Sequence, residues 1–531
     1  MKIESIFIRN FRPIGEQGLE LIFKNKNTIF IGENNVGKSS IFEAIKKTLN
    51  PQNPFDIEDW YAGDQSKPID IHLNCILDDT QIDKLISILT LPLTVQGYKQ
   101  NFTERLSYKL RKSIGPGSSC FFKLGELEIK NNDAYLVGRA ETTQHHQTNW
   151  ADFIERMNLR NNEFSLEKIK NYLKSIHPSP NTFNFRVDIT KELQELIKNS
   201  IIIIEEFREK SLNVLSESVI SPTGKELPSV LFNLKNSRAG QKKKYEQIRK
   251  KFHELFPTLN VDVIKEKGEI KILIEKSKIE STTFYLGAGI LESLLLLTHL
   301  LAHSDKVLCV DHPELHLHPH AQRCLNTFIE GSDVNQILTI THSPYFANLN
   351  KTCDIMRFIN KDMQTAINKL PQNYFADEEY FKLEQFLDID TKELFFSRKC
   401  ILAEGPTEIG ALPIFASKLG YDLDENGVSV VNMGGKRSVE LFVKLCDGFR
   451  IPYFIIGDND AEELLSKYKS KFVLPGQFED LLPKELLEEA KKVVGDSKPR
   501  IGRYAARKMV QEDMNIPEVI QQIVEQIKQI I

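Results

Sequence analysis

The chain has 531 residues, which suits roughly two to four domains of about 150 residues each. Hydrophobic residues make up 41% of it and charged residues 27%, a balance that is typical of a folded soluble protein and excludes a mainly disordered chain. The 69 Lys and Arg residues against 73 Asp and Glu leave a net charge of -4, so nucleic-acid binding would need a local basic patch.

Cysteine usage and apolar runs indicate the compartment. The seven cysteines form no CxxC pair, which argues against a zinc site and predicts a reducing environment. Residues 1–8 alternate polar and apolar side chains like a strand and lack the apolar core of a signal peptide. The longest apolar runs, Ile201–Ile204 and Leu294–Leu297, are far too short to span a bilayer. We therefore expect a cytoplasmic protein without a membrane-spanning segment.

A phosphate-binding loop is predicted early in the chain. The strand-like stretch Thr28–Ile31 leads into GENNVGKSS, which fits the pattern GxxxxGK[ST], and the amphipathic helix Ser40–Leu49 follows. In such a loop backbone N–H groups turn toward the phosphates, Lys38 reaches the β and γ phosphates, and the Ser39 hydroxyl binds Mg²⁺. A Gly-rich turn without a ligand is the alternative. The predicted nucleotide contacts are Gly32, Asn35, Gly37, Lys38, Ser39 and Ser40.

The predicted secondary structure changes from strands to helices at about residue 150. Strand patterns at Ile3–Ile8, Leu19–Phe23 and Ile69–Leu77 make residues 1–150 an N-terminal ATPase lobe, whereas residues 151–255 read as a helical insert. Within the insert the segment Lys242–Lys251 is strongly basic. It is either a solvated helix face or a contact for nucleic-acid phosphates.

Residues 256–395 are interpreted as a C-terminal ATPase lobe. A Gly-rich turn containing Gly287 and Gly289 opens an apolar helix, and by itself this is a weak anion site. A buried strand beginning at Lys306 then ends at Asp311, the position where a P-loop ATPase holds Mg²⁺.

Histidines are dense after this strand. The run HPELHLHPH begins at His312, and ITHSP, which contains His342, follows one helix and one strand later. Zinc is one explanation for so many histidines. They span two strand ends and a loop, however, so that a single metal cluster is the weaker interpretation.

The last part of the chain, residues 396–531, contains a second group of candidate functional residues, which are acidic. Glu404 follows an apolar strand and Glu408 lies in the first turn of the next helix, while the strand Tyr453–Gly457 runs into Asp458 and Asp460. Acids at the ends of neighbouring parallel strands converge at one edge of a sheet, where their oxygens suit Mg²⁺ or Mn²⁺. Each motif alone could be an acidic helix cap, but together they favour a metal site.

The motifs together resemble a known class of protein. GENNVGKSS, LGAG, VLCVDHPELHLHP and ITHSP look like the ATP-binding-cassette ATPases of the SMC and recombination-repair kind, in particular those of the OLD (overcoming lysogenization defect) family. The resemblance implies an α/β fold in which an ABC/SMC-like P-loop ATPase carries a helical insert for dimerisation. It also implies that Leu286 to Gly289 form a signature loop that touches ATP held by a second subunit, and that His342 senses the γ-phosphate.

One position departs from the family pattern. The family has two consecutive acidic residues here, the second of which polarises the attacking water, whereas this chain has Asp311-His312. A neutral imidazole is a weaker electrostatic partner than a carboxylate, so nucleotide binding should survive while hydrolysis is expected to be slow or absent. Glu314 is a substitute, but it lies two residues farther along the chain.

EGPTE followed by DND resembles the Toprim domain of topoisomerases, primases and OLD nucleases. An ATPase followed by Toprim is the arrangement of the OLD family, which includes the nuclease subunit of Gabija-type antiphage systems. The resemblance implies that Glu404, Asp458 and Asp460 are catalytic metal ligands, and that Glu408 with Glu479 or Asp480 completes a second metal position. Lys498 is the candidate cation near the transition state, with Arg503 as its rival and a solvated charge as an equal alternative.

The residues and the resemblance together predict a metal-dependent DNA endonuclease regulated by ATP binding. The resemblance alone implies a homodimer or larger homo-oligomer and a role in antiphage defence. A helicase or reverse-transcriptase partner is an open alternative, as is a non-catalytic ATP-sensing or DNA-clamping protein. Apolar residues from Ile516 onward recur with helical spacing. This tail is expected to pack on the Toprim sheet, with a partner helix as the alternative.

Overall fold

The computed structural model describes residues 1–49, 55–78, 81, 190–205, 226–276 and 287–530, together with the backbone of five strands between residues 105 and 141 and of residues 279–282. The chain divides into two compact units. Unit 1 contains Met1–Phe30, Asn35–Thr341 and Asn360–Ala366, and unit 2 contains Ile31–Asn34, His342–Ile359 and Ile367–Ile531. The predicted segments 1–150, 151–255, 256–395 and 396–531 do not coincide with these units.

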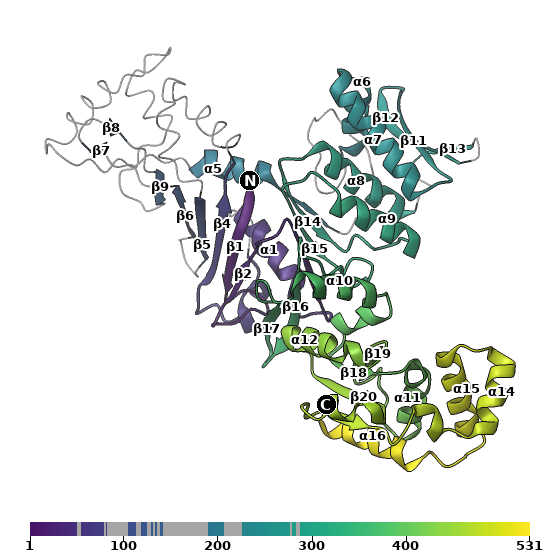
Figure 1. The fold of residues 1–531 in the computed structure, drawn as a ribbon. Helices are drawn as coiled ribbons and strands as arrows, with labels where there is room; N and C mark the ends of the chain where they lie inside the picture. The colour runs from purple at the N-terminus through teal and green to yellow at the C-terminus, as the bar shows by residue number, and fades with distance from the viewer. Residues whose placement is uncertain are drawn as a thin grey trace, which may run out of the picture. The chain divides into compact units, whose positions relative to one another are not determined.

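Unit 1 contains an antiparallel sheet of order β2-β1-β4-β5-β6-β9 (Figure 1). Alternating side chains explain it, because Ile3, Ile6 and Ile8 of β1 are fully buried while their neighbours are less so. The strands are β1 (Lys2–Arg9), β2 (Leu19–Ile22), β4 (Ile69–Ile76), β5 (Arg105–Lys112), β6 (Ser118–Leu124) and β9 (Gly138–Glu141). The predicted strands Ile3–Ile8, Leu19–Phe23 and Ile69–Leu77 are thereby confirmed.

The second sheet has the order β10-β14-β15-β3-β16-β17, and its first four strands are parallel. These are continuous apolar runs, as expected for strands covered on both faces. The strands are β10 (Ile201–Ile204), β14 (Val307–Asp311), β15 (Gln336–Ile340), β3 (Asn27–Gly32), β16 (Cys353–Lys361) and β17 (Gln364–Lys369). The helices α1 (Lys38–Leu49), α8 (Ala288–Ala302) and α9 (Pro319–Glu330) follow strands or turns of this region.

The prediction that residues 151–255 form a helical insert is wrong for one described segment. Ile201–Ile204 is not helical but forms β10, which pairs in parallel with β14. Four consecutive β-branched residues explain this, because isoleucine favours strands. Helices are present on either side as α5 (Thr190–Ser200), α6 (Leu227–Asn236) and α7 (Ala239–Leu255).

Helices α6 and α7 contact the antiparallel sheet β11-β12-β13, built from Asn260–Glu266, Glu269–Lys276 and Ile279–Thr282. The apolar side of α7 is buried through Tyr245, Ile248, Phe252 and Leu255. Several of its basic residues have partners inside the protein. Lys244 bonds the carbonyl of Ala302, Arg249 that of Val261, and Lys251 pairs with Glu254. The basic segment is therefore partly structural.

Unit 2 contains a parallel four-stranded sheet of order β19-β18-β20-β21. The strands are β18 (Lys399–Ala403), β19 (Val428–Asn432), β20 (Tyr453–Gly457) and β21 (Lys471–Val473), and the helices are α10 (Asp377–Phe386), α11 (Pro406–Lys418), α12 (Val439–Phe449), α13 (Glu462–Leu465), α14 (Lys484–Val494), α15 (Lys498–Gln511) and α16 (Glu518–Ile530). The sequence placed β18, β20 and the first turn of α11 correctly, because the two strands are apolar runs followed by acids.

The C-terminal helix packs on this domain, as the sequence predicted. Ile520, Ile523 and Ile527 of α16 are fully buried in the same apolar cluster as Phe415 of α11 and Phe454 of β20. The stripe of apolar residues therefore faces the domain's own core. Among the described residues, no helix combines the length and the apolar character that crossing a membrane requires.

Candidate nucleotide and metal sites

Glycine geometry shapes the turn between β3 and α1. Gly32 has a φ of 138° and Gly37 a φ of 94°, values that favour glycine. A Cβ on Gly37 would lie 2.5 Å from Oγ1 of Thr365, and one on Gly32 would lie 2.2 Å from the carbonyl oxygen of Phe358. Lys38 begins α1 and is buried, while Ser39 is exposed. The loop thus has the tight turn into a helix N-terminus that phosphate binding requires.

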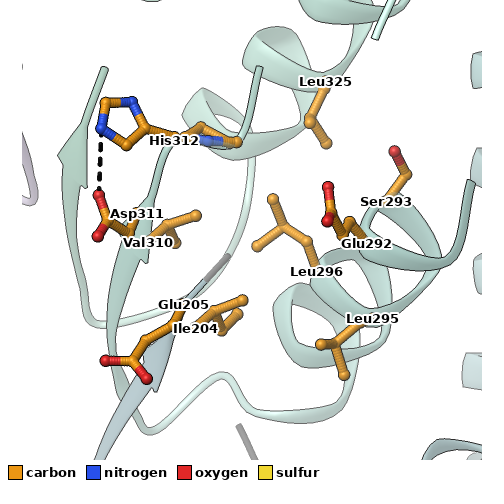
Figure 2. Close-up of a pocket in the computed structure, with 11 residues that line it drawn as sticks. Ile204, Glu205, Glu292, Ser293, Leu295, Leu296, Val310, Asp311, His312 and Leu325 are labelled. Atoms are coloured by element: carbon orange, nitrogen blue, oxygen red, sulfur yellow. Dashed lines mark ion pairs between the residues drawn. The ribbon is translucent and has the colours of Figure 1, made fainter. Parts of the chain in front are cut away.

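Asp311 ends β14, and two further ionisable residues follow it. His312 Nε2 lies 3.5 Å from Oδ1 of Asp311, and its Nδ1 lies 3.2 Å from Oε1 of Glu314. Figure 2 shows Asp311 and His312 at the end of the strand, with Glu205 beyond Ile204 on the neighbouring strand. The imidazole therefore lies between two carboxylates.

Burial and neighbouring charges shift both pKa values. Burial raises the pKa of Asp311, and the charges of Glu205 and Glu314 add to this. For His312, burial lowers the pKa, but the hydrogen bond that the ring donates to Glu314 and the charges of Glu314 and Asp311 outweigh it and raise the pKa overall. A raised pKa means that, at a given pH, more of the imidazole already carries its proton and cannot accept another from water.

Glu205 is a residue that the sequence interpretation missed. It directly follows β10, whose Ile204 pairs with Val310, so its carboxylate lies at the same sheet edge as Asp311. It forms an ion pair with Lys46 of α1. An apolar strand ending in an acid was the available signal, as in VLCVD. It was missed because the strand was assigned to a helical insert.

The remaining nucleotide candidates are placed as follows. Gly287 is the exposed N-cap of α8, and a Cβ on Gly289 would lie 2.6 Å from the carbonyl oxygen of His316. Leu286 lies outside the described residues. His342 is exposed and begins a segment of unit 2, directly after Thr341, which ends a segment of unit 1. Asn35 is exposed with a φ of 61°, and Ser40 is buried in α1.

The residues of the ATPase site fit a magnesium nucleotide. Oδ1 of Asp311 is buried and accepts no hydrogen bond within the described part of the chain, its nearest charged neighbour being Nε2 of His312 at 3.5 Å. Such an oxygen is available for a cation or its water. Together with the exposed Ser39 hydroxyl, this residue would hold the Mg²⁺ that accompanies ATP.

The acidic residues of unit 2 come from the ends of neighbouring strands. Glu404 follows β18 and Asp458 follows β20, and these strands pair in parallel with Ala403 opposite Ile456. Oε2 of Glu404 accepts a hydrogen bond of 3.0 Å from the backbone N–H of Asp458. A Cβ on Gly457 would lie 3.1 Å from this oxygen. Glycine at 457 therefore lets the two strand ends approach.

A second group of side chains joins this edge. Oε1 of Glu479 accepts a hydrogen bond of 2.7 Å from the Thr407 hydroxyl and lies 3.0 Å from Nζ of Lys498. Glu408 is only 1% exposed, and its Oε1 accepts a hydrogen bond of 3.3 Å from the N–H of Gly405. Four different elements, two loops and two helix starts, thus contribute to one acidic cluster, which we define as Glu404, Glu408, Asp458, Asp460 and Glu479.

Burial and neighbouring carboxylates raise two pKa values in the acidic cluster. Burial raises the pKa of Asp458 to about 6, helped by the charges of Glu404, Glu479 and Asp460 and opposed by Lys498. Burial also raises the pKa of Glu408 to about 7, with Asp458 and Glu479 contributing. Excess negative charge at one place is the property that a bound cation relieves.

Asp480 is placed differently from the other candidates. Its Oδ2 accepts a hydrogen bond of 3.0 Å from the backbone N–H of Gln477 and so caps the turn at Phe478–Leu481. Of the pair Glu479 or Asp480, it is Glu479 that lies in the acidic cluster. Arg503 is exposed on α15, whereas Lys498 is bonded to the cluster.

The acidic cluster is not a closed metal cage. Among the described residues, no three or more His, Cys, Asp or Glu side chains lie close enough together to hold a metal ion as they stand. The donor set of carboxylates is nevertheless the one that Mg²⁺ and Mn²⁺ prefer. Mutual repulsion keeps such groups apart when no cation is bound. Glu404, Asp458 and Asp460 would hold a first ion, and Glu408 and Glu479 a second.

The fold and the two sites define an ATPase with a P-loop joined to a Toprim domain. The sequence model of the AAA ATPase domain family matches residues 1–347, and the chain belongs to this family. The Toprim model of overcoming lysogenization defect protein-like proteins matches residues 395–460. Both parts of the resemblance seen in the sequence, the ATPase and the OLD-like Toprim domain, are thereby confirmed.

Two relatives and one solved structure illustrate the similarity. The OLD nuclease of Thermus scotoductus is 31% identical over 29% of this chain, an alignment that spans only 30% of that protein. Endonuclease GajA of Bacillus cereus is 23% identical over 92% of this chain and 80% of its own length. The SMC head bound to the C-terminal winged-helix domain of ScpA aligns with 70% of this chain and 98% of its own, at 12% identity and a TM-score of 0.41.

Proposed function

We propose that the protein is a DNA endonuclease that depends on Mg²⁺ or Mn²⁺ and is regulated by ATP bound at its P-loop. The acidic cluster at the carboxyl edge of the β18-β20 sheet carries this proposal, because acids from four elements meet there beside Lys498. The names of the relatives, an OLD nuclease and an endonuclease, support it.

The residues have separate roles in this proposal. Glu404, Asp458 and Asp460 hold the first cation, while Glu408 and Glu479 hold the second. Bound metal supplies an activated water and stabilises the leaving oxygen of the phosphodiester. Glu404 is held by the N–H of Asp458 and is the candidate general base. Lys498 is positioned by Glu479 and neutralises charge on the phosphate that is attacked.

ATP has a regulatory role in the same proposal. Lys38 and Ser39 bind the phosphates, Asp311 holds Mg²⁺, and His312 makes turnover slow. Gly287, Gly289 and His342 act on nucleotide across a homodimer, and the protein works in the cytoplasm in antiphage defence. A helicase or reverse-transcriptase partner belongs to the same proposal as an optional component.

Nicking of supercoiled plasmid tests the nuclease. The double variant Asp458→Asn and Asp460→Asn keeps side-chain shape but removes two charges, and it should abolish cleavage in Mg²⁺ or Mn²⁺. A matched control is Asp424→Asn with Asp513→Asn, two exposed aspartates, of which Asp513 pairs with Lys418. Cleavage that persists in the first variant, or disappears in the control, contradicts the assignment. A wild type that binds DNA but never cleaves it would favour the non-catalytic clamp.

A further inference from the structure

Helix α15 begins inside the acidic cluster and continues away from it with a strongly basic sequence. Its 14 residues, KPRIGRYAARKMVQ, contain no acid. Lys498 is bonded to Glu479, and Lys508 pairs with Glu489 and Glu512. The other three basic residues are Arg500, Arg503 and Arg507.

These three arginines share one face of the helix. Residues separated by three, four and seven positions lie on the same side of an α-helix, and all three are exposed. Within the described residues none of the three guanidinium groups forms an ion pair or hydrogen bond with the protein. We call this set the arginine stripe. Exposed cations without an internal partner are available for an external anion.

The opposite face of α15 fixes the stripe relative to the acidic cluster. Gly502 and Ala506 are buried against α11, whose first turn carries Glu408. A Cβ on Gly502 would lie 2.4 Å from the carbonyl oxygen of Thr407, and one on Gly410 would lie 1.9 Å from that of Pro499. Backbones this close leave little freedom for one helix to shift against the other. The stripe therefore stands at a fixed position beside the metal ligands.

We propose that the arginine stripe binds the phosphate backbone of the DNA whose scissile phosphate lies at the acidic cluster. The inference rests on the proposed nuclease function and names the surface that holds its substrate. Arg500 and Arg507 are about 10 Å apart along the helix axis, at 1.5 Å per residue. This equals about three base steps of one strand at roughly 3.4 Å each. Three arginines can thus meet neighbouring phosphates of a single strand.

The chemistry of the stripe favours a phosphate polymer over other partners. Guanidinium groups form bidentate hydrogen bonds to phosphate, and the apolar side chains of α15 are already committed to α11. The stripe begins beside the acidic cluster, where the scissile phosphate would lie, and this favours the DNA backbone over an acidic protein or an anionic lipid surface. The basic segment of α7 is a weaker candidate, because Lys244, Arg249 and Lys251 are bonded internally.

Salt-dependent binding tests the proposal. Affinity for a labelled duplex of about 30 base pairs is measured by fluorescence anisotropy in EDTA, between about 50 and 200 mM KCl. The triple variant Arg500→Gln, Arg503→Gln, Arg507→Gln should bind at least about tenfold more weakly at the lower salt. The slope of log K against log salt should become shallower by about 2.7, because each phosphate contact contributes about 0.9.

A charge-matched control isolates position from net charge. Lys382, Arg450 and Lys469 are exposed, and the latter two precede β20 and β21 at the amino edge of the sheet, opposite the acidic cluster. Their triple change to Gln should leave affinity and slope unaltered. Equal losses in both variants, or none in the stripe variant, overturn the proposal. Tighter binding of an RNA duplex of the same sequence than of DNA, lost in the stripe variant, overturns DNA as the occupant.

Cleavage assays separate this inference from the nuclease assignment. At saturating DNA the stripe variant should cleave at close to the wild-type rate, with a KM at least about tenfold higher. The Asp458→Asn, Asp460→Asn variant should instead bind DNA with the wild-type salt slope and fail to cleave. If that variant still cleaves, the nuclease site is misassigned while the stripe remains supported by binding. If the stripe variant binds and cleaves DNA like the wild type while the Asp458→Asn, Asp460→Asn variant fails to cleave, the stripe proposal is wrong and the nuclease assignment stands.

Discussion

Lys436 Nζ lies 2.5 Å from Oδ2 of Asp460 and forms an ion pair with it. Asp460 is one of the carboxylates that the proposed metal site needs. Lys436 follows the Gly434-Gly435 turn after β19, and its Nζ also lies 3.3 Å from the carbonyl oxygen of Asp460. An ammonium group and a divalent cation compete for the same oxygen. Metal binding must therefore move Lys436 away from Asp460.

Removing this competitor should tighten metal binding. Lys436→Ala is expected to lower the Kd for Mn²⁺ by about 1.5- to 5-fold, since an exposed ion pair is worth about 0.2–1 kcal/mol. Isothermal titration calorimetry at low salt measures this directly. Lys467→Ala, which breaks the neighbouring pair with Glu440, is the control and should leave the Kd unchanged. Weaker Mn²⁺ binding in Lys436→Ala would show that the lysine supports the site.

The pKa values of the acidic cluster predict a pH dependence. With pKa values of about 6 for Asp458 and about 7 for Glu408, both carboxyls are partly protonated at pH 6 and ionised at pH 8.5. Metal must displace those protons, so that Mg²⁺ affinity should fall as the pH is lowered through this window. Calorimetry in buffers of different ionisation enthalpy should detect proton release at pH 6.5 and almost none at pH 8.5. Glu408→Gln should reduce the release at pH 6.5, and an unchanged value there would contradict the assignment.

Local sequence patterns predicted most of the fold around the site. The strands that end at Asp311, Glu404 and Asp458 are apolar runs followed by an acid, and such runs can be read without knowing the rest of the molecule. The glycine at 37 could also be predicted, because the pattern GxxxxGK[ST] places a glycine there, and the structure gives it a positive φ. These features depend on neighbours within a few residues.

Contacts between distant loops could not be predicted in the same way. Thr407 meets Glu479, and Lys436 meets Asp460, only because the sheet order β19-β18-β20-β21 brings separate turns together. No local pattern distinguishes Glu479 in the acidic cluster from Asp480, which caps its own turn. Glu205 was missed because the assignment of its strand to a helix hid the sheet edge.

The environment of His312 bears on ATP turnover. Its imidazole lies between Asp311 and Glu314, and its raised pKa leaves more of the ring already protonated, so that less of it can take a proton from the attacking water. We expect ATP to bind through Lys38 while hydrolysis is slow, and His312→Glu to increase the rate without much change in nucleotide affinity. Phosphate release measures the rate, and Ser39→Ala serves as a control that weakens Mg²⁺-nucleotide binding instead. Wild-type turnover of about 10 per second, a typical enzyme value, would refute slow hydrolysis.

An arginine and a glutamate that pair within unit 2 are the contact through which the proposed effect of nucleotide on cleavage would pass. Arg398 Nε and Nη2 lie 2.7 and 2.8 Å from the two carboxylate oxygens of Glu33, which follows Gly32 of the phosphate-binding loop. Arg398 directly precedes β18, the strand that ends at Glu404. If nucleotide binding moves Glu33, the ion pair would pass that movement to Arg398 and so to the start of β18.

Arg398→Ala should therefore reduce the factor by which ATP changes the cleavage rate, while leaving ATP affinity and the rate without ATP nearly unaltered. Arg398→Lys, which keeps the charge but loses the bidentate pair, should give an intermediate effect. Lys38→Ala, which removes nucleotide binding, shows the cleavage rate of a protein on which ATP has no effect. If Lys38→Ala changes neither cleavage, nor nucleotide sensitivity, nor oligomeric state, the two sites are not coupled.

Close packing of α11 against α15 makes a prediction for stability. A Cβ on Gly410 would lie 1.9 Å from the carbonyl oxygen of Pro499, so Gly410→Ala must push α15 away from α11. Overpacking of this kind costs about 1–3 kcal/mol of unfolding free energy, which corresponds to a fall in Tm of roughly 2–12 °C for a domain of this size. Gly240→Ala is the matched control, because that helical glycine has nothing within 4 Å of the added Cβ and should be neutral or stabilising. Since α15 carries Lys498 beside the acidic cluster, Gly410→Ala should also lower the cleavage rate at a temperature where the protein is still folded. A Tm equal to that of the wild type would mean that the helices can separate at no cost, and the fixed position of the arginine stripe would then lose its basis.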